Sequence, residues 1–344
     1  MRNFITFISL IIINFSAYSF DIETESFYGQ KSEKIDLSIL SSTDVEVFDP
    51  VMKEFSSQNK NLRIKYVVAS SVDIYNKILS GSDEFDVVMS SAMDLQMKLA
   101  NDGYALTYNS DVSSRIPKWG IWQNRLFGFS LEPIVIVISQ EKFENLSMPK
   151  DRRDFLSVLR SNPDYFKDKI VTYDINVSGA GYLFSTQDER QADIFWRLSE
   201  VMGGLGTKVV CCSSEMLDLI EDGNKYVAYN VIGSYAAKRA LQSTNLKIIY
   251  PNDYTHILLR TAFIPKTVKN EKNAGVFLDF VLNKNGQKIM EEKSEILSIY
   301  NENINQMPNA KPIRLDTGLL IYLDKLKRQN FLREWNSAIL RWFF

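Results

Sequence analysis

The sequence predicts an α/β protein of two lobes that are joined by two strand crossovers. Residues 35–106 alternate strand and helix three times, and residues 170–250 return to this rhythm without repeating the sequence. Two long apolar stretches, residues 127–138 and 255–264, border the second block. Because consecutive strand–helix units favour parallel strands in one sheet, we expect one lobe around each block and a crossover in each apolar stretch.

Size and charge restrict the class of protein further. The chain has 344 residues, 45% of them hydrophobic, which is enough for about two domains with a large core. The net charge is −2, and both signs are mixed along the chain. A nucleic-acid-binding protein is expected to carry a basic footprint instead, so we expect no nucleic-acid partner.

The first 19 residues have the layout of a secretory signal peptide. Arg2 supplies a positive charge, residues 4–15 are almost all apolar, and residues 16–19 are mostly small. An uncleaved membrane anchor is the alternative, but the apolar run of about a dozen residues is short of the ~20 that a membrane span needs. The sequence therefore predicts export, with residues 1–19 removed.

The chain offers little of the chemistry that an enzyme needs. Cys211 and Cys212 are adjacent and are the only cysteines, which excludes a four-cysteine zinc site. His256 is the only histidine available to a serine triad, and its apolar surroundings in the sequence favour a structural role. A Gly-x-Ser-x-Gly motif is absent. We expect no enzyme, no metal and no cofactor.

The first block is predicted to hold three parallel strands. Residues 20–33 are polar and indicate a linker. Strands are expected at residues 35–40, 62–68 and 85–89, and helices at residues 45–56, 72–79 and 92–101. Ser41, Ser42 and Thr43 follow the first strand, and Ser90 and Ser91 follow the third. In such sheets ligands bind beyond the carboxyl ends of the strands.

The two apolar stretches mark the lobe limits. Pro133 interrupts the stretch at 127–138, and proline is tolerated poorly in a central strand. A strand that leaves one lobe for the other accommodates it. We therefore assign residues 34–130 and 262–344 to lobe I and residues 131–261 to lobe II.

The rest of the chain is predicted from the same patterns. Strands are expected at residues 170–174, 209–212, 227–232 and 247–250, and helices at residues 142–165, 194–202, 215–221, 235–241, 272–291 and 318–335. A further helix is expected to start within residues 177–183, after a flexible turn. Residues 300–316 are expected to form an irregular loop, and the apolar residues 339–344 to cover a core.

Four strand-to-helix junctions are the candidate binding site. They comprise Ser41, Ser42 and Thr43; Ser90 and Ser91; Ser178, Gly179, Ala180 and Gly181; and Gly233, Ser234 and Tyr235. Backbone N–H groups at a helix start, together with hydroxyl groups, suit an anion. Plain helix capping is the alternative for the serine pairs. We predict that all four junctions surround one cleft.

Two further side chains are candidates for ligand contact. Arg260 lies in an otherwise apolar stretch, where a buried charge needs a partner, and its guanidinium could bind a carboxylate or phosphate. Arg115 and Arg125 are weaker candidates, expected at the surface. Trp119 could form an aromatic wall over the ligand or simply pack near the crossover.

Several stretches resemble bacterial solute-binding proteins of the cluster that includes ferric-iron and phosphorylated-sugar binders. They are residues 171–183, Gln187-Asp188, residues 195–198, residues 229–236, residues 127–133 and residues 319–328. The resemblance covers nearly all of the exported chain and is nearest to the phosphoglycerate-transport regulatory protein branch. It implies a type II periplasmic binding fold, in which two α/β lobes close over a ligand by a hinge motion.

The resemblance also separates two kinds of ligand. Ferric-iron binders of this cluster carry adjacent tyrosines where this chain has Gly233 and Ser234, with Tyr235 just beyond. Phenolates bind iron, whereas an N–H and a hydroxyl suit an oxyanion. We expect a periplasmic monomer that captures a small phosphorylated or carboxylated metabolite for an ABC permease. A ligand-sensing subunit for a membrane sensor kinase and a ferric-iron carrier are the alternatives.

Overall fold

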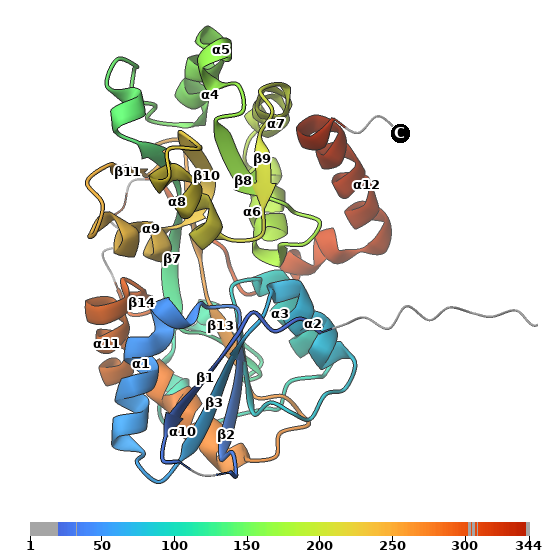
Figure 1. Ribbon diagram of the computed structural model, residues 1–344. Helices are drawn as coiled ribbons and strands as arrows, with labels where there is room; N and C mark the ends of the chain where they lie inside the picture. Colours follow the sequence, from blue (N-terminus) through green and yellow to red (C-terminus); the bar gives the residue numbers. More distant parts are fainter. Residues whose placement is uncertain (1–19, 32, 302–303, 305–306, 308, 342–344) are drawn as a thin grey trace, which may run out of the picture.

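Two α/β lobes lie end to end, and strand β7 (Ser130–Ser139) runs between them (Figure 1). The computed structural model describes residues 20–31, 33–301, 304, 307 and 309–341. The expected signal peptide, residues 1–19, lies outside the described residues. Within the described part of the chain, no helix has both the length and the apolar character that a membrane span requires.

Lobe I is built on a sheet with the strand order β1-β3-β2-β4-β13-β6-β5. Its strands are β1 (Thr24–Gly29), β2 (Leu37–Ser41), β3 (Arg63–Val68), β4 (Val87–Ser90), β5 (Ile121–Trp122), β6 (Leu126–Gly128) and β13 (Thr261–Phe263). Strands β2, β3 and β4 are parallel, as predicted from the first block. The lobe I helices are α1 (Val45–Gln58), α2 (Ser71–Leu79), α3 (Met93–Asn101), α10 (Glu271–Leu282) and α11 (Lys284–Ser294), with short 3₁₀ turns at η1 (Ser113–Arg115) and η2 (Lys118–Gly120).

The expected linker at residues 20–33 is wrong in part, because β1 forms within it. This strand pairs antiparallel with β3 over its whole length, from Thr24 opposite Val68 to Gly29 opposite Arg63. It is the outermost strand of the sheet, and most of its side chains are exposed. An edge strand is held by backbone hydrogen bonds and needs no apolar run, which explains why its polar sequence gave no strand signal.

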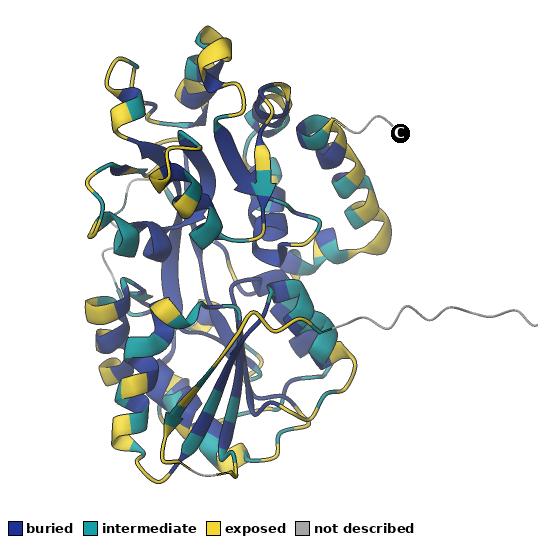
Figure 2. Cartoon of the chain, viewed as in Figure 1, coloured by how far each residue is buried: buried dark blue, intermediate teal, exposed yellow. Residues whose placement is uncertain are grey.

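Lobe II is built on the second sheet, with the order β15-β12-β7-β10-β8-β9 and with β11 and β14 also paired to β7. The strands of lobe II besides β7 are β8 (Ile170–Tyr173), β9 (Lys208–Val210), β10 (Val227–Ile232), β11 (Leu246–Ile249), β12 (Thr255–Leu258) and β15 (Ala310–Pro312). Strand β14 (Leu297–Ser298) pairs with Leu131 and Ser130, at the end of β7 that lies in lobe I. Its helices are η3 (Glu141–Phe143), α4 (Arg152–Ser161), α5 (Pro163–Phe166), α6 (Gly179–Gln191), α7 (Ile194–Gly204), α8 (Ser213–Glu221) and α9 (Gly233–Ala240). Strands β8, β9 and β10 are parallel, and the central strands of both lobes are buried (Figure 2).

Both predicted crossovers exist, but each consists of two strands. The first is β6 followed by β7, and the second is β12 followed by β13, with Leu259 and Arg260 between them. Strand β12 pairs with β7 through Ile257 and Pro133, whereas β13 pairs with β4 and β6 of lobe I. The second crossover therefore changes sheets at Arg260.

Two predicted helices are each divided by a capping residue. The expected helix at residues 272–291 ends at Leu282, and Asn283 caps α11 by accepting a hydrogen bond from the Gly286 N–H. The expected helix at residues 318–335 is a 3₁₀ segment, η5 (Thr317–Leu323), followed by α12 (Lys325–Trp335), which Asp324 caps. Asn and Asp compete for backbone N–H groups and so restart a helix.

The end of the described chain returns to lobe II. The Phe331 ring of α12 packs against the rings of Tyr182, Phe195 and Trp196. The final segment, η6 (Asn336–Leu340), brings its backbone against Gly203, where a Cβ would lie 2.0 Å from the Ala338 carbonyl oxygen. The lobe limits predicted from the sequence placed residues 262–344 in lobe I. They did not foresee that α12 and η6 pack on lobe II.

Candidate functional site

A pocket lies between the two lobes, at the carboxyl ends of their parallel strands. Lobe I contributes residues that follow β2, β3 and β4, and lobe II contributes residues that follow β8, β9 and β10. The lining residues are Glu23, Ser42, Asp44, Ala69, Ser70, Ser71, Ser91, Tyr173, Val177, Ser178, Ala180, Cys211, Cys212, Ser213, Ile232 and Tyr235. Five of these lining residues were also predicted for a shared cleft, namely Ser42, Ser91, Ser178, Ala180 and Tyr235.

On the lobe I side, one serine of each junction faces the pocket and another binds its own backbone. The Ser42 and Ser91 hydroxyls lie 3.3 Å apart, and the Ser91 N–H donates to the Ser42 hydroxyl. Ser41 instead accepts from the Thr43 N–H, and Ser90 accepts from the Ala92 N–H. Ser41 and Ser90 thus stabilise the turns behind the pocket wall. The capping alternative does not describe them, because the N-cap residues are Asp44 for α1 and Ala92 for α3, and neither helix start has a side-chain cap hydrogen bond.

On the lobe II side, helix α6 starts at the pocket. Ser178 caps it by accepting from the Gly181 N–H at 3.2 Å, and the Gly179 N–H donates across the seam to the Ser71 hydroxyl of lobe I at 3.1 Å. Gly181 is packed against Tyr173, where a Cβ would lie 2.3 Å from the Tyr173 Cβ. Glycine at this position permits the close packing of the helix on its strand.

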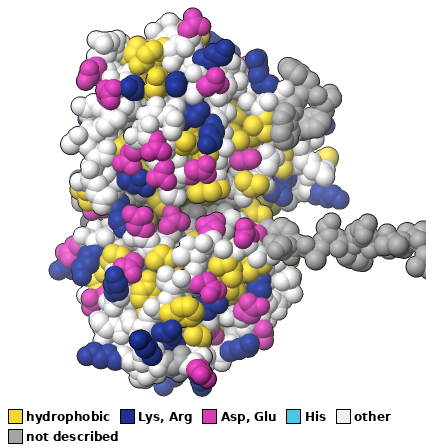
Figure 3. Space-filling model, in the orientation of Figure 1, with side chains coloured by type: hydrophobic (Ala, Val, Ile, Leu, Met, Phe, Trp, Pro, Cys, Tyr) yellow, Lys and Arg dark blue, Asp and Glu magenta, His cyan; other side chains and the backbone are white. Residues whose placement is uncertain are grey.

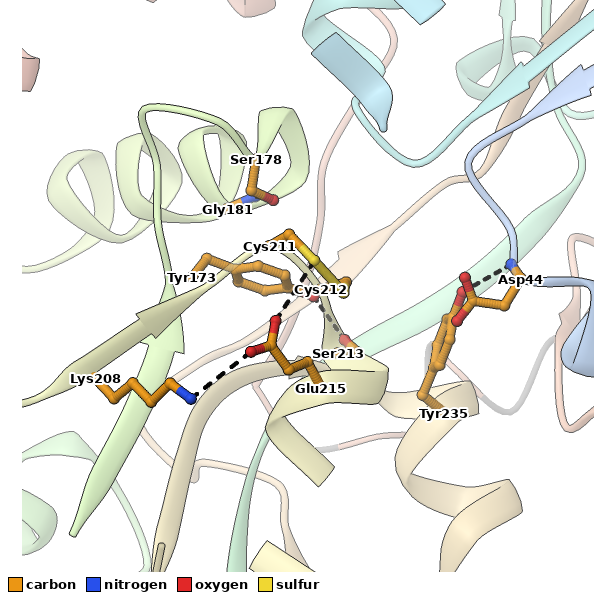
Figure 4. The surroundings of a disulfide bond; sticks show 10 residues. All are labelled: Asp44, Tyr173, Ser178, Gly181, Lys208, Cys211, Cys212, Ser213, Glu215 and Tyr235. Carbon is orange, nitrogen blue, oxygen red and sulfur yellow. Dashed lines mark hydrogen bonds and ion pairs between the residues drawn. A yellow bond between two sulfur atoms is a disulfide. The ribbon is translucent and has the colours of Figure 1, made fainter. Parts of the chain in front are cut away.

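Ser213, at the start of α8, is central to the pocket although it was not predicted. Its hydroxyl lies 2.6 Å from the Tyr173 hydroxyl (Figure 4) and accepts from the Ile232 N–H at 3.0 Å. Ser70 and Ser71 line the lobe I side in the same way. The sequence did carry a signal for these residues. Ser70-Ser71 and Ser213-Ser214 each stand where an expected strand gives way to an expected helix, as at the four predicted junctions.

Arg260, Thr43 and Ser234 meet beneath the pocket rather than in its wall. Arg260 is 1% exposed and donates to both Glu132 oxygens, at 2.5 and 3.2 Å. It also donates to the Thr43 hydroxyl, and the Ser234 hydroxyl donates to Glu132. Burial alone would lower the pKa of Arg260, but the Glu132 carboxylate outweighs burial and raises it. The sequence predicted a partner for the buried Arg260 charge, and that partner is the Glu132 carboxylate of the protein itself.

The remaining predicted residues lie outside the pocket lining. Gly233 starts α9 against Pro133, where a Cβ would lie 2.7 Å from the Pro133 carbonyl oxygen. Trp119 is 39% exposed in η2 of lobe I. Gly179 and Gly181 lie in the first turn of α6, and only their backbone atoms are available to a ligand.

Two carboxyl groups face the pocket and were not predicted. Burial raises the pKa of Asp44 and of Glu23, and in Glu23 the neighbouring Asp44 charge adds to the effect. The Asp44 N–H donates to the Tyr235 hydroxyl at 3.3 Å, which links the lobes a second time (Figure 4). Acidic side chains also lie on both sides of the seam on the face shown in Figure 3. Among the described residues, no Lys or Arg lines this pocket.

The lobes are closed in this structure. The cavity holds about 60 Å³, whereas small-molecule sites commonly reach about 300–1,000 Å³. Among the described residues, hydrogen bonds cross the seam from Gly179 to Ser71, from Asp44 to Tyr235, and from Lys238 to the Glu46 carbonyl. A solute of several heavy atoms therefore requires the lobes to separate before it binds.

Gly179→Ala is expected to hold the lobes apart. A Cβ at Gly179 would lie 2.8 Å from Leu95 Cδ1 and 2.8 Å from the Ser71 hydroxyl, both in lobe I. Small-angle scattering should show a larger radius of gyration than for the unchanged protein, with little loss of stability because α6 tolerates alanine. Gly204→Ala is the control, since a Cβ there meets nothing within 4 Å. An unchanged radius for Gly179→Ala would contradict the tight contact.

Comparisons with known proteins agree on one family. Residues 41–288 match the family described as bacterial extracellular solute-binding protein. The substrate-binding protein of an ABC transporter from Agrobacterium tumefaciens is 31% identical, with 92% of this chain and 98% of that chain covered and a TM-score of 0.88. A comparison with curated protein sequences gives no match.

Two more distant structures share the fold. The periplasmic binding protein AfuA from Actinobacillus pleuropneumoniae, solved with fructose-6-phosphate bound, is 19% identical over 90% of this chain and 99% of that chain, with a TM-score of 0.69. Iron-bound HitA from Pseudomonas aeruginosa is 14% identical over 77% of this chain and 87% of that chain, with a TM-score of 0.64. At these identities the likeness concerns the fold, which is the predicted two-lobed one.

Proposed function

Because the chain belongs to the bacterial extracellular solute-binding proteins, we propose that it captures a small phosphorylated or carboxylated metabolite between its lobes and delivers it to an ABC permease. The supporting observation is the pocket itself, in which strand-to-helix junctions of both lobes meet at one seam. We further propose that it acts as a monomer in the periplasm.

The helix starts suit the anionic group of the solute. Helices α6 and α8 both begin at the pocket, where helix N–H groups lack intrahelical partners. The start of α8 has no side-chain cap, and the Gly179 N–H of α6, which donates to Ser71 in the closed lobes, becomes available to a solute when the lobes separate. The Ser42, Ser91, Ser178 and Ser213 hydroxyls add donors that rotate to fit the ligand. Neutral donors of this kind bind an oxyanion without a cationic side chain.

The two pocket carboxyls suit the rest of the solute. Asp44 and Glu23 accept hydrogen bonds when ionised, so they favour a ligand that also carries hydroxyl groups. Burial raises the pKa of both groups, so protonating either one beside an anion costs less free energy than protonating an exposed carboxyl. A phosphorylated or carboxylated polyol satisfies both halves of the pocket.

Iron is the weaker candidate ligand. Ferric iron would require phenolate oxygens at this site, and Tyr173 and Tyr235 are the tyrosines in the pocket lining. Burial raises the pKa of both hydroxyls, which favours neutral phenols.

Delivery to a permease is preferred over a sensor kinase because the Agrobacterium protein, which matches nearly the whole chain, is a transporter component.

The test is a thermal-shift screen of the chain without residues 1–19 against sugar phosphates, polyol phosphates, di- and tricarboxylates and Fe³⁺. A solute at 100 times its dissociation constant stabilises the folded state by about 2.7 kcal/mol. We expect at least one anion to raise the melting temperature. Stabilisation by Fe³⁺ alone would overturn the proposed ligand class.

The same screen tests where the solute binds. Loss of a hydrogen bond to a charged ligand costs about 1.5–3 kcal/mol, so Ser91→Ala and Ser178→Ala should each weaken binding by roughly 10- to 100-fold. Ser157→Ala is the matched control, because the exposed Ser157 hydroxyl bonds only the Arg153 carbonyl of its own helix. Equal affinity in all three variants would place the solute elsewhere.

A further inference from the structure

The pocket wall contains a bonded pair of adjacent cysteines that solute capture does not explain. Cys211 follows β9, and Cys212 is the N-cap residue of the nine-residue helix α8. The two form a disulfide (Figure 4). Cys211 is exposed and Cys212 half-buried, and both line the pocket. Small molecules that enter the seam therefore reach both sulfurs.

A carboxylate completes a group of three donors at this point. Glu215 lies in the first turn of α8, and its Oε2 is 3.7 Å from the Cys211 sulfur. One donor atom from each of Cys211, Cys212 and Glu215 lies within 4.8 Å of the others. In a tetrahedral site with metal–sulfur bonds of about 2.3 Å and metal–oxygen bonds of about 2.0–2.2 Å, neighbouring donors lie roughly 3.5–3.8 Å apart. The Cys211–Glu215 distance already meets this requirement.

We propose that the reduced Cys211 and Cys212, with Glu215, bind one soft divalent cation of the zinc and cadmium class. Two molecules of a small thiol reduce the disulfide to two cysteine thiols and leave as their own disulfide. The metal ion then displaces one proton from each thiol and binds both thiolates and the Glu215 carboxylate. The fourth position remains open toward the pocket.

The surroundings suit metal-bound thiolates. Cys212 is the N-cap residue of α8, where the backbone N–H groups of the helix start stabilise negative charge. Lys208 lies 3.8 Å from Glu215 on the side away from the sulfurs (Figure 4). Both Lys208 and Glu215 are 44% exposed, so water screens this pair and the metal ion can compete for the carboxylate.

Cadmium binding to the chain without residues 1–19 tests the proposal, because cadmium thiolates absorb in the ultraviolet. The protein is reduced with a dithiol, desalted without oxygen and titrated with Cd²⁺ alone, beside an unreduced sample. We expect one Cd²⁺ per reduced chain and no thiolate band in the unreduced chain. A disulfide that resists the dithiol, or a reduced chain without the band, would overturn the proposal.

Three variants separate the three-donor site from adventitious binding. The double variant Cys211→Ser and Cys212→Ser should lose the band, and Glu215→Gln should weaken Cd²⁺ binding at least tenfold. Glu221→Gln is the control, because Glu221 is on the same helix but pairs with Arg239. Cd²⁺ affinity in Glu215→Gln equal to that of the control would remove the carboxylate from the site and so refute the proposal. Circular dichroism of each variant checks that the fold is retained.

Discussion

Asp188→Ala is expected to lower the free energy of unfolding by about 3–5 kcal/mol, the usual cost of breaking a buried ion pair. Asp188 lies in α6 with none of its side chain exposed. Its carboxylate accepts from Arg152 at 3.2 Å, from the Tyr229 hydroxyl and the Asn230 amide at 2.9 Å each, and from the Tyr254 hydroxyl at 3.0 Å, with His256 Nε2 3.2 Å away. Removing the carboxylate leaves several buried donors without an acceptor.

Arg152 makes this loss large. Its side chain is 1% exposed, and Asp253, at 3.0 Å, is its other carboxylate partner. Urea unfolding followed by circular dichroism measures the effect. Asp222→Ala is the control, because Asp222 is exposed and should change the free energy by less than about 0.5 kcal/mol. Equal losses in the two variants would show that the buried network contributes nothing specific.

The same carboxylate makes stability depend on pH. Burial would raise the pKa of Asp188, but the Arg152 charge, together with the nearby His256 ring and the hydrogen bond from Asn230, outweighs burial and holds the pKa well below its usual 3.8. A depressed folded-state pKa contributes stability above the unfolded value, and this contribution is lost as pH falls below it. The unchanged protein should therefore lose stability below about pH 4 more steeply than Asp188→Ala does.

Much of the fold follows from local sequence signals. The three β–α units of lobe I, the parallel strands of lobe II and both crossovers were predicted, because each buried strand is an apolar run that ends in small or polar residues. The failures have a common cause. Strand β1 is held by its neighbour rather than by its own composition, and the packing of α12 on lobe II depends on ring contacts between distant residues.

The site was less accessible to sequence reasoning. The positions of Ser42, Ser91 and Ser178 followed from a simple rule, that parallel strands end at one edge of a sheet. The rule does not say which of two adjacent serines faces the pocket. It also cannot show that Arg260 finds Glu132, because the two residues are brought together only by pairing between β7 and β12. Asp44 and Glu23 were missed since a carboxylate was not expected beside an anion.

Glu132→Gln is expected to cost about 3–5 kcal/mol of unfolding free energy, because it leaves the Arg260 charge buried and unpaired. Glu132 is 1% exposed, and it accepts from Arg260, from the Ser130 hydroxyl at 3.1 Å and from the Ser234 hydroxyl. Arg260 also donates to Thr43 of lobe I. The network thus ties both lobes to the two crossover strands.

Comparison with an exposed pair separates burial from charge pairing as the cause. Glu221 pairs with Arg239, whose side chain is 23% exposed, so Glu221→Gln should cost no more than about 1 kcal/mol. Urea unfolding of both variants gives the two values. If Glu132→Gln lowers the unfolding free energy no more than Glu221→Gln does, the prediction is wrong, because Arg260 then does not depend on Glu132 for a buried partner.

The double variant Glu132→Leu with Arg260→Met isolates the unpaired charge. Replacing both partners of a buried ion pair with apolar groups is often neutral, whereas removing one partner is not. Ser234 and Thr43 would lose their partners, at about 1–3 kcal/mol for each buried group left unsatisfied. Since the unpaired charge is then absent, the double variant should be more stable than the summed losses of Glu132→Leu alone and Arg260→Met alone imply. If the two single losses simply add, Glu132 and Arg260 do not stabilise each other. That result would contradict the ion pair inferred from their distance of 2.5 Å.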